Sequence, residues 1–452
     1  MNSKVYIKNK HELGGTLARN ITLDLIECGI GAVLPCNLLP AVLRFEPETR
    51  ILTVNGDDYQ LDNRGRLFVI GGGKAAGLMA EVLEAITGVD VITAGVVVTK
   101  EAQGQTRRIK TLIAGHPIPD GQGLEAVRQI LALKEEYDIG RRDIVVSLLS
   151  GGASALMPAL PPGLCLEDKQ RTTELLMRAG ADINEINIVR KHISWIKGGW
   201  LGKHFSPARV ISLIISDVVG DDPVTIASGP TTADTSTFAD AVAIAEKYHL
   251  MDELPTVIIA YLNKGLSGQI PETPKSLDNC RNYIIGNVGT ALQAMAARAR
   301  GLGLNTMIIT DAQTGDTSKT ALTMVSEIMS DKFMGYDLLM AGGETTLALR
   351  PGSGIGGRNQ HYTAVTLAGL AGYSNGWLVA GFGTDGSDYL PGIAGALADN
   401  ETAAAIKVRE IDIADYVFRY DSYSLFDQIG RSLVKIEDTG TNVGDIVLYM
   451  FI

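Results

Sequence analysis

Three carboxylates follow a strongly apolar stretch near the middle of the chain. Residues 210–215 are rich in β-branched side chains and stop at Ser216, which is typical of a buried strand of a parallel sheet. Ligands of open α/β sheets gather at the carboxyl ends of such strands. Neighbouring acids repel one another unless a cation joins them, and Mg²⁺ is held by one or two carboxylates together with water and phosphate. The loop therefore predicts Mg²⁺ ligands among Asp217, Asp221 and Asp222, with a solvated acidic turn as the alternative.

A glycine-rich turn containing Gly72, Gly73 and Lys74 follows the apolar run 67–70 and precedes a helix-like segment. Backbone amides at a helix N-terminus bind anions, and glycine lets a phosphate approach closely. The turn also matches the G-x-G-x-x-A dinucleotide fingerprint, which requires an acid about 20 residues further on. Asp90 has roughly that spacing, but it precedes the apolar run 91–98 instead of ending it. The lysine favours phosphate binding, and a tight turn with a solvated lysine is the alternative.

Two further segments offer groups for anions. Ser150, Gly151, Gly152 and Ser154 follow the apolar run 143–149, and we expect them to bind the phosphates of a cofactor. In the helix-like segment 184–199, Arg190, Ser194 and Lys197 fall on one face. We expect Lys197 to contact the cofactor and Arg190 the substrate, although a basic stripe is usually a solvated helix face.

A glycine-rich loop at residues 352–357 leads to Arg358 and Asn359 at an expected helix start. A guanidinium can grip a carboxylate or phosphate through two hydrogen bonds. Asp385 lies in a second acidic loop, at residues 383–388. We expect Asn359 and Asp385 to bind substrate; a mobile surface turn is the alternative for the first loop, and a metal site or a simple turn for the second.

The elements that position these loops follow one recurring theme. Apolar runs at 67–70, 143–149, 337–341 and 377–382 each end in a glycine-rich turn, which is typical of repeated βα units. We therefore predict an α/β fold with two domains: a Rossmann-like N-terminal domain (1–265) with a mostly parallel sheet and a smaller α/β C-terminal domain (283–452). The polar segment 264–282 marks the boundary, and Asn55-Gly56 predicts a hairpin within residues 43–62.

Composition and charge restrict the classes of partner that this protein is expected to bind. The 452 residues carry a net charge of −11, which argues against nucleic acid and an anionic membrane surface. The four cysteines are scattered and show no metal-binding spacing, which suits a reducing cytosol. No secretory signal and no apolar span of about 20 residues is evident. We expect a cytoplasmic enzyme that acts on small molecules and could form a homo-oligomer.

Several long motifs, taken together, resemble the glycerate 2-kinase family, which has a DUF4147 N-terminal domain and a MOFRL C-terminal domain. The resemblance implies transfer of the γ-phosphoryl group of ATP to the 2-hydroxyl of D-glycerate with a divalent metal such as Mg²⁺, in a cleft between the domains. It implies catalytic roles for Lys74 and Arg358, and we assign Asp217 to metal binding or to the hydroxyl proton. The motifs are GHPIPDGQGLEA (115–126), SGGASAL (150–156), NEINIVRKHISWIKGG (184–199), SDVVGDDPVTIASGPTTADTSTFADA (216–241), GGETTLALRPGSGIGGRNQ (342–360), GTDGSD (383–388) and TGTNVGD (439–445).

The chain also departs from that family. The first 66 residues match poorly, and His361, Pro391-Gly392 and Tyr420-Asp421 stand where members commonly carry other residues. These changes put the exact hydroxy-acid acceptor in question. Two other functions stay open: an NAD-dependent hydroxypyruvate-type reductase, based on the G-x-G-x-x-A match, and a non-catalytic sensor of sugar acids or nucleotides.

Overall fold

The computed structural model describes residues 6–451, whose contacts divide the chain into two units. The parallel-sheet unit consists of Leu39–Ser216 and Asp221–Ile285. The mixed-sheet unit consists of Asp217–Gly220, Gly286–Ile452 and the N-terminal stretch up to Leu38. This division differs from the predicted domains 1–265 and 283–452, because the first helices pack with the C-terminal part of the chain.

Six strands form the sheet of the parallel-sheet unit. They are β4 (Leu67–Gly72), β5 (Ile92–Thr99), β6 (Ile109–Ile113), β7 (Ile144–Leu149), β8 (Arg209–Ile215) and β9 (Cys280–Gly286). Their order is β6-β5-β4-β7-β8-β9, and β4 pairs in parallel with both β5 and β7. This is the order of a Rossmann-type sheet, in which the direction of winding reverses between β4 and β7. The predicted α/β fold with a parallel N-terminal sheet is therefore confirmed.

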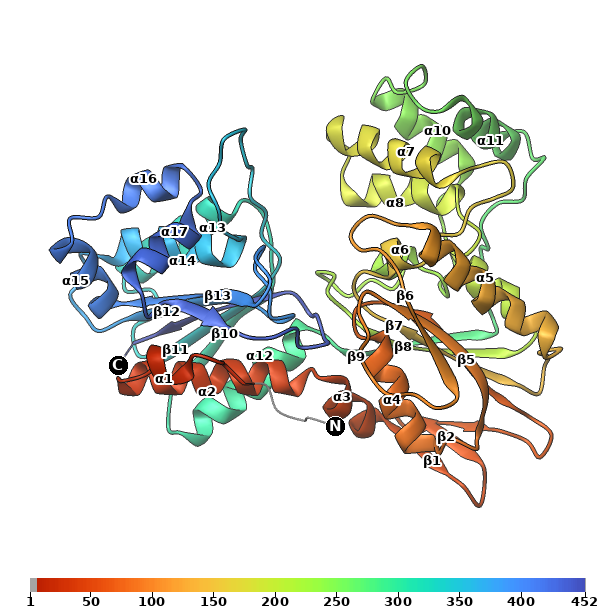
Figure 1. The fold of residues 1–452 in the computed structure, drawn as a ribbon, viewed down its shortest axis with the longest axis horizontal. Helices are drawn as coiled ribbons and strands as arrows, with labels where there is room; N and C mark the ends of the chain where they lie inside the picture. Colours follow the sequence, from red (N-terminus) through yellow and green to blue (C-terminus); the bar gives the residue numbers. More distant parts are fainter. Residues whose placement is uncertain (1–5, 452) are drawn as a thin grey trace. The chain divides into compact units, whose positions relative to one another are not determined.

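Helices of this unit form two groups. Two of them pack against the central strands, namely α4 (Ala76–Thr87) and α5 (Gly121–Glu136). Four others share a separate apolar core that includes Leu176, Val189 and Phe238, and Figure 1 shows them grouped together. These four are α7 (Leu166–Arg178), α8 (Ile183–His192), α10 (Phe238–Lys247) and α11 (Thr256–Leu266).

A small antiparallel sheet precedes β4. It consists of β1 (Leu43–Glu46), β2 (Ile51–Val54) and β3 (Asp57–Gln60). Asn55 and Gly56 join β2 to β3 with φ angles of 49° and 91°. Two consecutive positive φ values match the type I′ turn that favours Asn-Gly, so the predicted hairpin is confirmed.

The mixed-sheet unit also has six strands. They are β10 (Thr306–Gln313), β11 (Leu338–Gly343), β12 (Leu378–Gly383), β13 (Ile393–Asp399), β14 (Leu433–Lys435) and β15 (Asp445–Met450), in the order β10-β11-β15-β12-β13-β14. Only β10 and β11 pair in parallel among the described strands of this sheet. Figure 1 shows α2 (Leu17–Ala32) and α12 (Val288–Gly301) on one face and α13 (Thr317–Met329) and α14 (Arg358–Leu370) on the other.

Helix α2 is attached to this unit by a buried ion pair. Nε of Arg19 donates to Oδ2 of Asp399 over 2.6 Å, and Nη2 donates to Oδ1 over 2.9 Å. Arg19 is only 2% exposed, so removal of either partner would leave a buried charge unpaired. The apolar face of α2 does not by itself specify which surface covers it, which is why the sequence placed residues 1–38 with the N-terminal domain.

The remaining helices are short. They are α1 (Lys10–Leu13), α3 (Pro35–Val42), α6 (Ala153–Leu156), α9 (Trp200–Phe205), the 3₁₀ turn η1 (Ile226–Ser228), α15 (Asn400–Val408), α16 (Ile413–Phe418) and α17 (Ser422–Ile429).

Within residues 6–451 no single helix is long and apolar enough to cross a membrane, although α2 and α3 together, bent by 53°, pass that test by length and composition alone.

Candidate active site

Two of the predicted anion-binding loops are bonded to each other at the switch point of the parallel sheet. Lys74 follows β4 and Ser150 follows β7, and these two strands are neighbours. The backbone N–H of Lys74 donates to the carbonyl of Gly151 over 2.9 Å, and the N–H of Ala75 donates to Oγ of Ser150 over 3.0 Å. The structure therefore brings together loops that lie about 75 residues apart in the sequence.

Glycine is required where these loops meet. Gly73 has a φ of +138°, and a Cβ there would lie 2.2 Å from Oγ of Ser150. A Cβ on Gly72 would lie 2.7 Å from the Val98 side chain, so this glycine serves strand packing. Gly152 has a φ of +85°, and a Cβ there would lie 3.0 Å from the imidazole of His116. His116, which the sequence analysis did not single out, therefore borders the second loop.

A chain of polar contacts extends from the second loop into the helical group. Nζ of Lys197 donates to Oγ of Ser154 over 3.0 Å and to the Ser154 carbonyl over 3.2 Å. The hydroxyls of Ser154 and Ser228 are 2.9 Å apart, and Ser228 donates to Oδ1 of Asn187 over 3.1 Å. Lys197 is 1% exposed. The predicted cofactor residues Ser154 and Lys197 thus form one connected network.

Lys197 belongs to a cluster of three basic residues with Lys169 and Arg190, which we call the basic cluster. Burial, followed by repulsion from Lys169 and Arg190, lowers the pKa of Lys197 well below its ordinary value. Burial and repulsion from Arg190 lower the pKa of Lys169 to about 7. Nε of Arg190 donates to Oγ1 of Thr173 over 3.5 Å. The cluster therefore brings three basic groups together in a poorly solvated part of the parallel-sheet unit.

Lys169 was missed by the sequence analysis. Its Nζ is buried and has no hydrogen-bond partner among the described residues, and the whole residue is 3% exposed. A signal for it does exist, because Lys169 lies three and seven residues before the buried Thr172 and Leu176 on α7. That spacing places the lysine within the buried stripe of the helix.

In the mixed-sheet unit, Arg358 begins α14 and pairs with two carboxylates. Its Nε lies 2.5 Å from Oδ2 of Asp445, and its Nη1 lies 2.6 Å from Oε1 of Glu344. Oδ1 of Asp445 also accepts from Nδ2 of Asn359 over 2.9 Å. Burial lowers the pKa of Arg358, but Asp445 and Glu344 raise it by more, so the guanidinium is firmly charged.

Two buried carboxyls surround the start of α14. Burial raises the pKa of Asp445 to about 7, although Arg358 opposes the shift. Burial also raises the pKa of Asp388, whose oxygens accept from the backbone N–H groups of Asn359 and Gln360 over 3.0 and 2.8 Å. Neither Asp445 nor Glu344 was predicted as a site residue. They reach Arg358 because Asp445 is the first residue of β15 and Glu344 directly follows β11 in the same sheet.

The acidic loop is divided between the two units. Asp217 belongs to the mixed-sheet unit, where Oδ2 accepts from Nδ2 of Asn442 over 3.0 Å. Asp221 and Asp222 belong to the parallel-sheet unit, and Asp222 accepts from the N–H of Val224 and the hydroxyl of Thr225. Between residues 6 and 451, no group of three or more His, Cys, Asp or Glu side chains is arranged to hold a metal ion.

Asp385, the other predicted acid, accepts from the N–H of Ser387 over 3.0 Å, which closes the turn after β12. The N–H of Thr439 donates to its carbonyl over 3.3 Å. Asp385 is therefore anchored in the mixed-sheet unit beside the segment that leads to β15.

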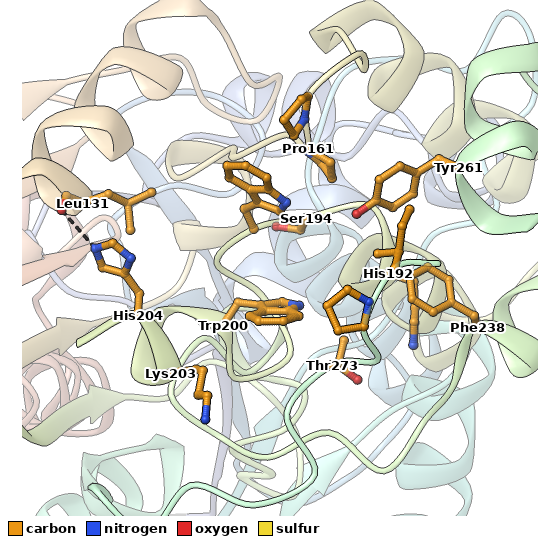
Figure 2. Close-up of a pocket in the computed structure, with 14 residues that line it drawn as sticks. Leu131, Pro161, His192, Ser194, Trp200, Lys203, His204, Phe238, Tyr261 and Thr273 are labelled. Atoms are coloured by element: carbon orange, nitrogen blue, oxygen red, sulfur yellow. Dashed lines mark hydrogen bonds between the residues drawn. The ribbon is translucent and has the colours of Figure 1, made fainter. Parts of the chain in front are cut away.

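An aromatic pocket lies on the segment that carries Lys197. The cavity has a volume of about 490 Å³, and Figure 2 shows the rings of Trp200, Phe238 and Tyr261 around it. His192 and Ser194 also line it, whereas none of the residues predicted to bind cofactor, substrate or metal does. Nδ1 of His192 lies 2.8 Å from the carbonyl of Ile188, so the imidazole is held by its own helix.

Comparison with known proteins agrees with this architecture. Residues 21–263 match the family described as Domain of unknown function (DUF4147), and residues 337–445 match the MOFRL family. The chain is 36% identical to the glycerate 2-kinase of Pyrococcus horikoshii over 95% of this chain and 96% of that protein. It is 38% identical, over 85% of this chain and 86% of the relative, to an Agrobacterium vitis protein provisionally named a hydroxypyruvate reductase.

A solved structure supports the same relationship. The glycerate kinase of Thermotoga maritima superposes with a TM-score of 0.82 at 32% identity, covering 96% of this chain and 99% of that chain. Similarity of this extent covers most of both units. The chain therefore belongs to the glycerate 2-kinase family, in which a DUF4147 domain precedes a MOFRL domain.

Proposed function

We propose that this protein is an ATP-dependent glycerate 2-kinase, which transfers the γ-phosphoryl group of ATP to the 2-hydroxyl of D-glycerate. The observation that carries the proposal is the bonded pair of loops at the switch point, Gly73-Lys74 and Ser150–Ser154. Such loops after neighbouring parallel strands suit phosphate groups. The names of the relatives from Pyrococcus and Thermotoga supply the acceptor.

In the proposed reaction, the 2-hydroxyl oxygen of the acid bonds to the γ-phosphorus as the bond between that phosphorus and the leaving oxygen of ADP breaks. The hydroxyl proton goes to a carboxylate, for which we propose Asp217. Phosphoryl transfer depends mainly on positioning and charge stabilisation, and we assign that stabilisation to Lys74 and Arg358. The other proposed contacts are Gly72, Gly73, Ser150, Gly151, Gly152, Ser154 and Lys197 for the nucleotide and Arg190, Asn359 and Asp385 for the acid.

The donor chemistry fits Mg²⁺, because a kinase site needs only one or two carboxylates in addition to water and phosphate. Bound Mg²⁺ neutralises phosphate charge. We propose Asp217 and Asp221 as the principal ligands, with Asp222, whose oxygens accept from Val224 and Thr225 in its own turn, as the third candidate. The four cysteines are free thiols, and we propose the reducing cytosol as the location.

A reductase is the second candidate, because one relative carries that name and the sheet has the Rossmann order. A dinucleotide site needs an acid at the carboxyl end of the second strand. Asp90 precedes β5 and so lies at the opposite end of that strand. This position weakens the candidate, and an absorbance assay with NADH and hydroxypyruvate tests it directly.

The deciding experiment measures ADP release with D-glycerate, tartronate and erythronate, with and without Mg²⁺, and identifies the phosphorylated carbon by phosphorus NMR. We expect Mg²⁺-dependent ADP release and phosphorylation at carbon 2. The variant Lys74→Ala controls for contaminating kinases. Phosphorylation at carbon 3 would contradict the 2-kinase assignment, NADH oxidation would favour the reductase, and ligand-induced stabilisation without turnover would favour a sensor.

A further inference from the structure

The basic cluster is unusual because its charges lack counterions. No described carboxylate lies within ion-pair distance, 4.0 Å, of Lys169, Arg190 or Lys197. Lys191, which follows Arg190 on α8, provides a contrast. It is equally buried, at 4% exposed, and its Nζ lies 3.1 Å from Oδ1 of Asp234. The fold therefore supplies an acid for a structural buried lysine but none for the cluster.

An unpaired buried cation is unfavourable unless something else balances it. Nζ of Lys169 makes no hydrogen bond to any described residue, and Lys197 contacts only the neutral oxygens of Ser154. A ligand anion would give these ammonium groups the partners that the chain withholds. Binding sites commonly keep such destabilising groups, because function and stability compete there.

The cluster is also connected to the switch point. Lys197 bonds to Ser154, which lies in α6 just after the loop that follows β7. Arg190 bonds to Thr173, one helical turn beyond Lys169 on α7. The three cations therefore come from α7, α8 and the segment that follows α8. Of the three, Lys197 contacts the Ser154 hydroxyl directly.

The charge of the cluster indicates the class of ligand. With all three groups protonated in the complex, a monoanionic carboxylate would balance one of three positive charges, whereas a phosphate dianion would balance two and offers more oxygens to two ammonium groups and a guanidinium. We propose that Lys169, Arg190 and Lys197 form a binding site for a phosphoryl dianion, with Lys169 as a direct ligand. The source of the dianion, either the nucleotide or the phosphorylated acid, rests on the kinase function proposed above.

Proton uptake should accompany binding. Of the basic groups around Lys169, Arg190 opposes its protonation, and Lys169 and Arg190 both oppose the protonation of Lys197. A bound dianion would instead favour the protonated ammonium, so the pKa of Lys169 would rise from about 7. Near pH 8, the complex would therefore hold more protons than the free protein.

The experiment is calorimetric titration of the full chain with pyrophosphate, ADP and 2-phosphoglycerate at pH 8, in two buffers with different ionisation enthalpies. We expect proton uptake in the wild-type protein, and a loss of affinity on the order of tenfold or more, together with a smaller proton uptake, in Lys169→Met. Lys203→Met removes an exposed lysine of the same unit and should change neither quantity. Lys169→Arg keeps the charge and should retain measurable affinity.

Comparison of the three ligands identifies the molecule that supplies the dianion. A selective effect of Lys169→Met on ADP would assign the site to the nucleotide, and a selective effect on 2-phosphoglycerate would assign it to the phosphorylated acid. Equal affinity of wild type and Lys169→Met for all three ligands would overturn the proposal. None of these readouts needs turnover, so Lys169-dependent binding without kinase activity would reject the kinase function while supporting the dianion site.

Discussion

Nζ of Lys197 donates a hydrogen bond to Oγ of Ser154 over 3.0 Å, although the lysine follows α8 and the serine follows β7. This contact joins the Rossmann-type switch point to the helical group of the parallel-sheet unit. It connects the two glycine-rich loops to the buried basic cluster, to which Lys197 belongs. The proposed phosphate binding of this unit therefore depends both on the loops at the ends of the parallel strands and on the helical group.

Lys74→Ala should lower kcat/KM for ATP and D-glycerate on the order of 10²-fold or more, because one preorganised charge would be lost from the transition state. The circular dichroism spectrum should stay unchanged. Lys110→Ala is the matched control, since Lys110 is an exposed lysine of the same unit that bonds to Gln129. Turnover near that of the wild type in Lys74→Ala would remove Lys74 from the mechanism.

Arg358→Ala should lower turnover by a similar factor, on the order of 10²-fold, and should also leave Asp445 without its buried cation. The pKa of Asp445 would then rise above about 7. Arg358→Lys should recover part of the activity, because it restores the charge without the two-pronged geometry. Arg350→Ala, an exposed arginine before the glycine-rich loop, should have no effect in the same steady-state assay.

Asp217→Asn and Asp221→Asn should each raise the Mg²⁺ concentration needed for half-maximal turnover, because a charged ligand becomes neutral. Asp222→Asn serves as the comparison, since its oxygens cap the turn at Val224 and Thr225. Chelation should abolish turnover, and added Mg²⁺ should restore it. An Mg²⁺ requirement that moves only in Asp222→Asn would reverse this assignment.

Lys169→Met should stabilise the free protein, most strongly at low pH. The folded-state pKa of about 7 lies below the ordinary 10.5, so the unfolded chain binds more protons between these values and stability rises with pH. Removing the lysine should add about 1–3 kcal/mol to the free energy of unfolding at pH 6, and less at pH 9. Denaturant unfolding at both pH values measures this difference, and an equal gain at both would show that Lys169 does not titrate.

His361→Gln should affect stability and leave the acceptor preference unchanged. Nε2 of His361 lies 2.8 Å from Oγ of Ser318, and the ring stacks on Tyr420 at 4.8 Å. Burial lowers the pKa of His361 to about 4, so the ring is neutral at pH 7 and acts as packing. We expect a loss of about 1 kcal/mol in stability, with D-glycerate still the best acid by kcat/KM. A changed order of acids would place His361 in acceptor recognition.

The sequence alone determined the local features of this protein. Unbroken apolar runs marked β4 and β7 because strands buried on both faces contain few polar residues. Asn55-Gly56 marked its hairpin because both residues accept positive φ. The glycine-rich turns and the family motifs could also be identified from the sequence, since each depends on residues close together in the chain.

Tertiary structure decided the electrostatic environment and the partners. Arg358 and Asp445 are 87 residues apart, and only the pairing of β15 with β11 and β12 brings the carboxylate to the guanidinium. Packing likewise assigned residues up to Leu38 to the mixed-sheet unit and buried Lys169 without a counterion. Burial and neighbouring charge, which set the pKa of a side chain, arise from segments distant in the sequence. For that reason the residue types alone predicted phosphate chemistry, whereas the tertiary structure showed that Arg358 is paired with Asp445 and that Nζ of Lys169 has no partner among the described residues.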